Sequence, residues 1–183
     1  MGRIVYRGLP LHFGRNRAYR YDAPDSTYGV CYLSFDLATA LMESVFHQHC
    51  WHRQRRRSIA LAEVWARMVR AVGTVQELVL ADLTAPGVMA QYFGLNLAQL
   101  ASRRYRSTRH LSAAVHGLQS EDGRPAFDGL VYPSRNNYPA ACVALFERAA
   151  YKVEVLADID LVDHAGWPRF VADWGIGIVK GTA

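Results

Sequence analysis

One carboxylate stands in the middle of an apolar helical segment. In CYLSFDLATALMESVFHQHC (31–50), Glu43 follows Thr39 and precedes His47 at intervals of four residues, so the three share one side of a helix. The apolar residues cover the opposite, broader arc. This pattern alone places Glu43 on a solvated face, where glutamate is commonest, although the same stripe could line a cleft. A carboxylate in a cleft could act as a metal ligand or as a catalytic group.

A cluster of possible metal ligands follows this carboxylate, namely His47, His49, Cys50 and His52. Four ligands from one short segment could hardly all face a single ion, because tetrahedral sites normally draw ligand pairs from separated segments. No CxxC or HxxxH pair stands elsewhere in the chain. The simpler explanation is a helix end at which protonated histidines meet the negative end of the dipole. The sequence therefore predicts no metal site.

Basic residues are almost all arginine in this chain of 183 residues with net charge +5; the lysines are Lys152 and Lys180. Arginine can form bidentate contacts with phosphate and carboxylate. Two arginine-rich stretches, RQRRR (53–57) and SRRYRSTR (102–109), could contact nucleic acid or an acidic protein. No recognisable nucleic-acid motif accompanies them, and charge runs are more often solvated faces or docking patches. Composition leaves a phosphate-bearing ligand, a nucleic acid and an acidic partner open.

Two further candidates lie at strand ends. Ser134 follows a predicted strand in VYPSR, but Pro133 and Arg135 break the Gly-x-Ser-x-Gly pattern of a nucleophile elbow. We therefore expect Ser134 to bond a ligand or to cap a turn rather than to act as a nucleophile. An arginine on a strand usually lies at an exposed edge or in a salt bridge. Beside Gly8, where a ligand can approach the backbone, Arg7 could instead hold a phosphate.

The pattern of the whole chain predicts a mixed α+β fold in a single domain over residues 1–183. Strands are predicted at 3–9, 29–34, 77–83, 129–134, 140–146 and 151–161. Helices are predicted at 37–50, with Asp36 as N-cap, and at 107–117; residues 58–72 weakly favour helix over strand, and 12–28 form a polar loop.

Nothing in the sequence marks the chain for export or for a membrane. No apolar run approaches the ~20 residues that span a bilayer, and MGRIVYRGLP at the start has no apolar signal region. The cysteines, Cys31, Cys50 and Cys142, are odd in number and far apart, so we expect free thiols. We therefore expect a cytoplasmic protein.

The order of these pieces resembles the RES domain family. The resemblance rests on strand VYRG, strand CYLS, helix ATALMES, LADLT and then GLVYPSR before an apolar strand, over about residues 3–160. It implies a fold similar to that of ADP-ribosyltransferases, with a mixed β-sheet core and flanking helices. Members of this family include NAD⁺-consuming toxins of bacterial toxin–antitoxin pairs.

The resemblance also implies which residues form the site. The family's characteristic arginine, tyrosine, glutamate and serine fall, in that order, on Arg7, Tyr32, Glu43 and Ser134. One stretch departs from the family, whose members usually carry Gly-Gly-Arg-aromatic-Asn before the tyrosine strand. Here Arg20-Tyr21-Asp22 stands in that place without a glycine pair. Arg20 is therefore a rival or helper of the arginine on the first strand.

The implied reaction is cleavage of the nicotinamide–ribose bond of NAD⁺, which is then a substrate and not a resident cofactor. Its transition state resembles an oxocarbenium ion, which a nearby carboxylate stabilises. Glu43 would bond the ribose hydroxyls and orient the nucleophile. Tyr32 would pack on the nicotinamide or the ribose, and Ser134 would hold the reacting geometry.

Arg7, with Arg20 as rival or helper, would pair with the pyrophosphate of NAD⁺. The expected NAD⁺-binding residues are Arg7, Gly8, Arg20, Tyr21, Tyr32 and Ser134. The acceptor stays open among water, inorganic phosphate and a target protein that would be ADP-ribosylated. The resemblance implies a cognate antitoxin, often of helix-turn-helix type, that blocks the NAD⁺ cleft, so nucleic acid would be contacted only through the antitoxin. The alternative is a basic nucleic-acid- or protein-binding module without catalysis, whose binding would depend steeply on salt.

Overall fold

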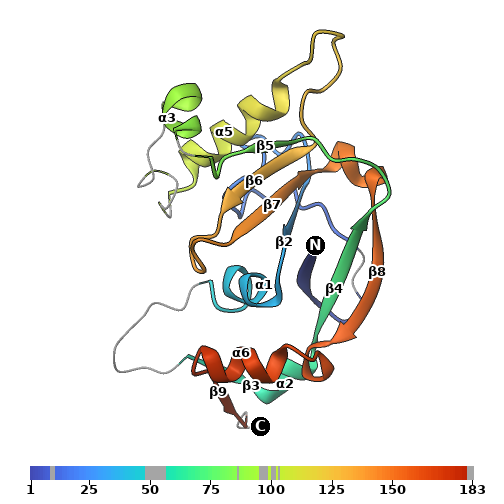
Figure 1. Cartoon of the computed structure of the whole chain (residues 1–183), viewed down its shortest axis with the longest axis vertical. Coiled ribbons are helices and arrows are strands. Elements are labelled where there is room, and N and C mark those ends of the chain that lie inside the picture. The colour runs from blue at the N-terminus through green and yellow to red at the C-terminus, as the bar shows by residue number, and fades with distance from the viewer. Residues whose placement is uncertain are drawn as a thin grey trace.

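A seven-stranded mixed sheet forms the centre of the computed structural model, which describes residues 1–8, 11–47, 57–85, 87–94, 99, 102 and 104–180. Its strands follow the order β5-β6-β7-β2-β1-β4-β8 (Figure 1). Their bounds are β1 (Gly2–Tyr6), β2 (Val30–Ser34), β4 (Arg67–Thr74), β5 (Leu80–Asp82), β6 (Gly129–Pro133), β7 (Ala141–Phe146) and β8 (Val153–Asp160). The β5–β6 pair is parallel, and the other neighbours are antiparallel. The predicted α+β class is confirmed.

Helices and a small second sheet flank this main sheet. The helices are α1 (Leu37–Glu43), α2 (Leu61–Trp65), α3 (Val88–Phe93), α5 (Arg106–Gly117), α6 (Trp167–Asp173) and the 3₁₀ helices η1 (Glu147–Lys152) and η2 (Leu161–Asp163). The second sheet pairs β3 (Ser58–Ala60) with β9 (Gly177–Val179) in parallel. Figure 1 shows α3 and α5 beside β5 and β6, with α2 and α6 near the second sheet. Within the described ranges, no helix combines the length and the apolar character that crossing a membrane requires.

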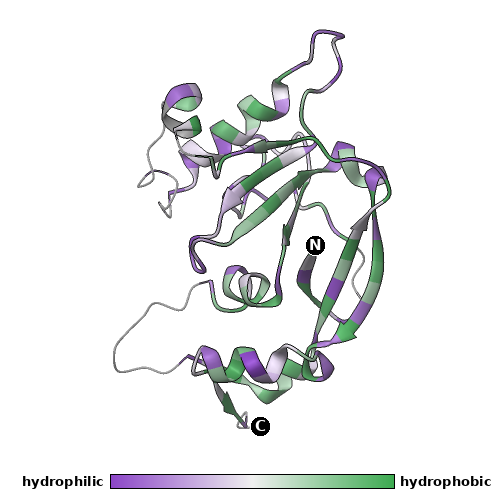
Figure 2. Cartoon of the chain, viewed as in Figure 1, coloured by the Kyte–Doolittle hydropathy of each residue, from purple (hydrophilic) through white to green (hydrophobic). Residues whose placement is uncertain are grey.

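Alternate residues of the central strands face opposite sides of the sheet, as the two-residue period of a strand requires. One buried cluster lies under α5 and contains Val30, Leu111, Val115, Ala144 and Phe146. A second cluster on the other face contains Cys31, Leu33, Val143 and Leu145. Figure 2 shows the resulting hydrophobic residues along β6 and β7. Because β2 and β7 are buried on both faces, they fix the positions of the segments that follow them, which are α1 after β2 and η1 after β7.

Helix α1 begins where the sequence predicts and ends earlier. Asp36 caps it, because its carboxylate accepts hydrogen bonds from Thr39 N at 2.8 Å and from Thr39 Oγ1 at 2.7 Å. At the other end, Ser44 Oγ donates to the carbonyl of Ala40 at 2.5 Å, and Phe46 N bonds Leu41 O at 3.0 Å. These contacts replace the regular helical bonds, so the helix stops at Glu43. Residues 44–47 form a turn, and 48–50 lie outside the described residues.

The weak prediction of helix over residues 58–72 is wrong for its second half. The segment contains β3 and α2, and β4 starts at Arg67. β4 pairs with β1 on one side and with β8 on the other, and each pairing runs over most of the strand. Long-range pairing of this kind overrides a local spacing that fits a helix equally well.

The main sheet opens between β1 and β2. These strands pair at a single position, Gly2 with Ser34. β1 instead pairs along its whole length with β4, and β2 pairs along its whole length with β7. The two halves of the sheet therefore diverge from this one contact, and the gap is available for side chains and a ligand.

Removal of the α1 cap tests how firmly this helix is held. We expect Asp36→Ala to lower the free energy of unfolding by about 1 kcal/mol, because two hydrogen bonds at the helix N-terminus are lost. Asp25→Ala is the matched control, since Asp25 makes the same pair of bonds to Thr27 in an exposed loop. Urea unfolding should show a clearly larger effect for Asp36; equal effects would contradict a structural role for the cap.

Candidate functional site

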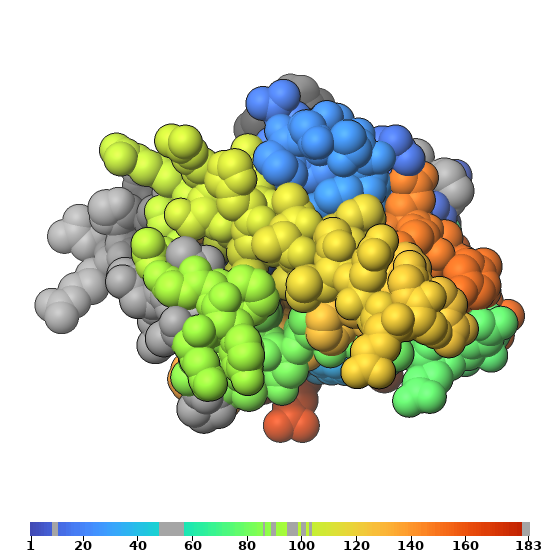
Figure 3. Space-filling model, turned by 90° about the horizontal axis from the view of Figure 1, so that it is seen from above, coloured from blue at the N-terminus to red at the C-terminus, as the bar shows by residue number. Residues whose placement is uncertain are grey.

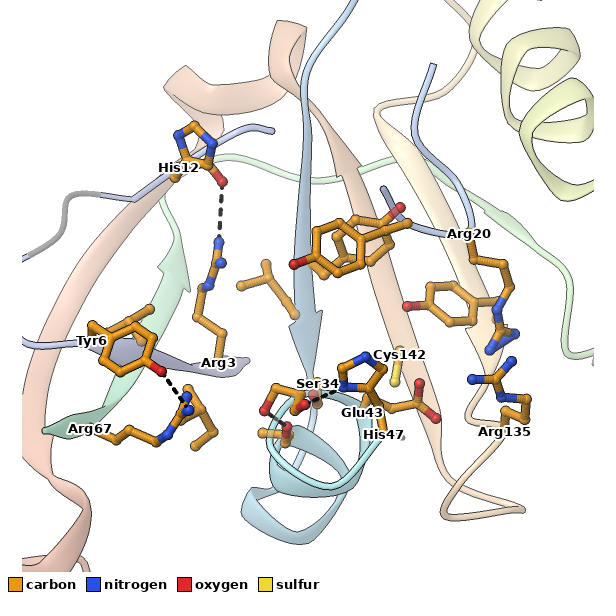
Figure 4. Close-up of a pocket in the computed structure, with 18 of the residues that line it drawn as sticks. Arg3, Tyr6, His12, Arg20, Ser34, Glu43, His47, Arg67, Arg135 and Cys142 are labelled. Atoms are coloured by element: carbon orange, nitrogen blue, oxygen red, sulfur yellow. Dashed lines mark hydrogen bonds between the residues drawn. The ribbon is translucent and has the colours of Figure 1, made fainter. Parts of the chain in front are cut away.

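The opening between β1 and β2 contains a cavity of about 540 Å³. This volume lies within the range of small-molecule sites, roughly 300–1,000 Å³. β1, β2, α1 and the turn after α1 form much of its wall, and the remaining lining comes from loops and from neighbouring strands (Figure 4). Its charged lining, histidines aside, consists of one carboxylate and four guanidinium groups, Glu43, Arg3, Arg20, Arg67 and Arg135. The cavity therefore favours a ligand that carries negative charge.

Glu43 projects from the last residue of α1 into this cavity. Its Oε1 accepts hydrogen bonds from Ser134 Oγ at 2.6 Å and from the backbone N of Asn136 at 2.9 Å. Its Oε2 makes no hydrogen bond to any residue that the structure describes. The carboxylate is thus fixed through one oxygen and leaves the other for a ligand. The Tyr32 ring lines the same cavity, so the strand residue and the helix residue face one cleft.

Ser134 lies at the end of β6 and is 2% exposed. Besides donating to Glu43, its hydroxyl accepts from Asn137 N at 2.9 Å. Asn137 Nδ2 donates to Thr39 Oγ1 at 2.7 Å, which joins the same loop to α1 one turn earlier. Thr39 and Glu43 therefore face the loop after β6; of the polar stripe, Glu43 and His47 line the cavity, whereas Thr39 is buried against that loop. Ser134 is held as a donor to the carboxylate and as an acceptor in the turn that follows it; its expected bond to a ligand stays a prediction.

A second hydrogen-bonded network holds the loop that carries Arg20. The Tyr32 hydroxyl donates to Asp22 Oδ1 at 2.9 Å and accepts from Tyr21 N at 2.8 Å. The other oxygen of Asp22, which is 1% exposed, accepts from Tyr19 N at 2.9 Å. Tyr32 therefore has two functions in the fold: its ring lines the cavity, and its hydroxyl fixes residues 19–22.

Helix α5 supports the same loop from outside. Arg109 Nε donates to the carbonyl of Tyr19 at 3.0 Å, and Ser112 Oγ donates to the carbonyl of Tyr21 at 2.7 Å. In Figure 3, blue residues of the N-terminal part lie against the yellow-green and yellow residues of this region. The loop is thus pinned between α5 and β2, which leaves the Arg20 side chain a defined direction.

The Arg20 guanidinium lies among aromatic rings at the cavity wall. Its Cζ is 5.5 Å from the ring centroid of Tyr21 and 5.2 Å from that of Tyr132, and the residue is 8% exposed. Burial alone would lower the pKa of Arg20. Electrostatic interactions with Tyr21 and Tyr132, followed by Glu43, raise that pKa above its usual value. Arg20 is a permanent cation placed for an anionic ligand.

The neutral groups of this region stay neutral at physiological pH. Burial raises the pKa of the Tyr32 and Tyr132 phenols well above their usual value. Burial also raises the pKa of Tyr21 and of the Cys142 thiol to about 12. Phenolate and thiolate charges therefore do not offset the arginines, and the cavity keeps its positive potential.

The structure separates the two candidate arginines. Arg7 does not line the cavity; its Nη2 pairs with Asp160 Oδ2 at 2.8 Å and bonds the carbonyl of Trp65 at 3.2 Å. Gly8 is also outside the lining and has a φ of 80° in the turn after β1. Tyr21 is fully buried behind the wall, where its ring packs on Tyr132. The structure therefore brings Arg20, and not Arg7, together with Glu43.

Arg135 is a cavity residue that the sequence interpretation treated only as a break in a serine motif. It follows Ser134 directly, lines the cavity, and its buried Nη1 has no hydrogen-bond partner among the described residues. Its guanidinium therefore adds a cation to the lining directly beside the serine that holds Glu43. The sequence feature that could have identified Arg135 was its position directly after Ser134, a candidate site residue. Arg3 of β1 and Arg67 of β4 are further cavity cations that the sequence interpretation did not single out.

The histidine cluster can be placed only in part. His47 lines the cavity, whereas His49, Cys50 and His52 lie outside the described residues. Among the residues that are described, no group of three or more His, Cys, Asp or Glu side chains is placed to hold a metal ion.

Comparison with known proteins identifies the family of the chain. A family model described as RES domain matches residues 5–164, which is most of the 183-residue chain. No curated protein matches the chain. The family is associated with NAD⁺ processing and is typically part of toxin–antitoxin systems. The resemblance found in the sequence is confirmed, and the chain belongs to the RES domain family.

Proposed function

We propose that this protein cleaves the bond between nicotinamide and ribose in NAD⁺. The observation that carries the proposal is the Glu43 carboxylate, fixed through Oε1 and open at Oε2, in a cavity that is otherwise cationic. Departure of nicotinamide leaves positive charge on the ribose, and a preorganised carboxylate lowers the energy of that state. Oε2 of Glu43 would accept hydrogen bonds from the ribose hydroxyls and hold the sugar in place.

Arg20 and Arg135 are the groups that we propose for the pyrophosphate. Both line the cavity with Glu43, and Figure 4 shows them close to one another on the same side of the site. Guanidinium groups match phosphate oxygens in geometry as well as in charge. Tyr32 would then contact the nicotinamide or the ribose through its ring, and Ser134 would act through the carboxylate that it holds.

The biological setting follows from the family. We propose that the protein is the toxin of a bacterial toxin–antitoxin pair, and that a cognate antitoxin, of helix-turn-helix type in the simplest case, covers the cleft. The exposed Arg104 and Arg106 at the start of α5 offer a basic surface near the cavity residue Tyr105. Toxicity would follow from loss of NAD⁺ or from modification of a target protein.

A direct assay tests the proposed reaction. We expect purified protein to release nicotinamide from NAD⁺, and Glu43→Gln to lower the rate by at least about 100-fold, because the charge that stabilises the transition state is lost. Glutamine keeps an oxygen for Ser134 Oγ and Asn136 N, so the loop should stay in place. Nicotinamide is measured by liquid chromatography.

The matched control for this assay is Glu154→Gln on the exposed strand β8, which should keep the wild-type rate. The assay uses high enzyme concentration, with phosphate present and antitoxin absent. If the wild type and Glu43→Gln release nicotinamide equally slowly under these conditions, the proposed reaction is excluded.

Comparison of the two arginines tests how the pyrophosphate is held. We expect Arg20→Gln to raise the KM for NAD⁺ by about 10- to 100-fold, the effect of losing a hydrogen bond between charged groups. Arg7→Gln should change KM by less than about threefold, because its partner Asp160 is outside the cavity and the pair is exposed. Steady-state kinetics measure both. A larger rise in KM for Arg7→Gln than for Arg20→Gln would indicate that Arg7, and not Arg20, binds the pyrophosphate.

A further inference from the structure

His47 stands on the same wall of the cavity as Glu43, four residues further along the chain. The turn that carries it is anchored by Phe46, which is 1% exposed and packs against Phe170 of α6 with ring centroids 5.7 Å apart. Phe46 N also bonds Leu41 O at 3.0 Å. His47 is therefore held in position after the end of α1, and Figure 4 shows its ring beside Glu43.

The hydrogen bond of the ring defines its tautomer. His47 Nδ1 lies 2.5 Å from the carbonyl oxygen of Ser44. A carbonyl oxygen only accepts, so Nδ1 carries the hydrogen and donates it. The neutral ring then has its lone pair on Nε2. Nε2 makes no hydrogen bond within the described part of the chain, so this acceptor is free for a proton from a ligand.

The site needs an acceptor of this kind besides Glu43. A carboxylate that stabilises a cationic transition state must stay charged while the bond breaks, and it loses that effect if it binds a proton. The cavity's other charged groups, apart from its two histidines, are Arg3, Arg20, Arg67 and Arg135, which only donate. The buried Tyr32 and Tyr132 phenols and the Cys142 thiol of the lining stay protonated, as described above. His47 is thus a cavity group with an available lone pair next to the reacting carboxylate.

We propose that His47 Nε2 takes the proton of a hydroxyl acceptor as its oxygen attacks C1′ of the nicotinamide ribose. This inference rests on the proposed NAD⁺ cleavage. The C1′–N bond breaks and its electron pair goes to the departing nicotinamide, which becomes neutral. The new C1′–O bond uses a lone pair of the acceptor oxygen, whose proton passes to Nε2 and later to solvent. With water, the products are nicotinamide, ADP-ribose and one proton.

This role selects a chemical class of acceptor. Water and alcohols attack efficiently only when a base removes their proton. An ionised oxygen, such as that of inorganic phosphate, carries no proton to remove and gains nothing from His47. The reactions with water and with phosphate should therefore respond differently to loss of the base.

The test uses His47→Asn, because the asparagine amide nitrogen can replace Nδ1 as donor to the Ser44 carbonyl while Nε2 is absent. We expect nicotinamide release in water, and methyl glycoside formation in added methanol, to fall by about 100-fold. Phosphate-dependent release should stay within about threefold of the wild type. His110→Asn, at an exposed histidine of α5 outside the cavity lining, is the matched control and should change none of these rates.

Three results would overturn the inference. One is a His47→Asn variant that keeps its rate in water. Another is a folded variant, by circular dichroism and thermal unfolding, that loses the water and phosphate reactions in equal proportion, which indicates a structural role. The third is a wild type that releases nicotinamide only with phosphate; the proposed function would then stand without this role for His47. A wild type that is inert with every acceptor would instead exclude the proposed function.

Discussion

The hydrogen bonds to Glu43 Oε1 are the constraint on which the site depends. They join the end of α1 to the loop after β6. Glu43 and Ser134, which form one of these bonds, are 91 residues apart along the chain. Both donors belong to that loop, and Asn137 ties it to α1 a second time through Thr39. The carboxylate is therefore oriented by the sheet and not by the helix alone. A charged group held in this way can stabilise positive charge without reorganising when the charge appears.

The Tyr32 hydroxyl fixes a second part of the cavity lining in a similar way. It donates a hydrogen bond to a buried carboxylate oxygen of Asp22 and accepts one from the backbone N–H of Tyr21. These bonds restrict the conformations open to residues 19–22. Arg20 is carried on this segment and projects among aromatic rings. Hydrogen bonds thus fix two opposite charges of one cavity: those of Glu43 itself, and those by which Tyr32 anchors the loop that carries Arg20.

Much of this could be predicted from the sequence, and the failures have physical causes. Strand composition located the strands that are buried on both faces, and Asp36 marked the start of α1. The ion pair of Arg7 was not predictable, because its partner Asp160 lies far away in the sequence and holds Arg7 outside the cavity lining. Strand β4 was missed because its pairing with β1 and β8, and not its local sequence, makes this segment a strand rather than a helix. Arg135 was overlooked, since its place in the cavity depends on how the loop after β6 folds, which no local pattern describes.

The sheet itself explains why the cavity lies where it does. β1 and β2 share one register pair and are otherwise bonded to different neighbours, so each is held firmly while the space between them stays open. Residues of both strands line the cavity as a result. A cleft that forms where two paired strands diverge needs no domain movement. Separate hydrogen-bond networks can then fix different parts of its lining. Here one network, through the loop after β6, fixes the Glu43 carboxylate, and another, through the loop that Tyr32 anchors, fixes Arg20. Both groups line the same cavity, and the Glu43 charge contributes to the raised pKa of Arg20, so a carboxylate and a cation face one ligand space.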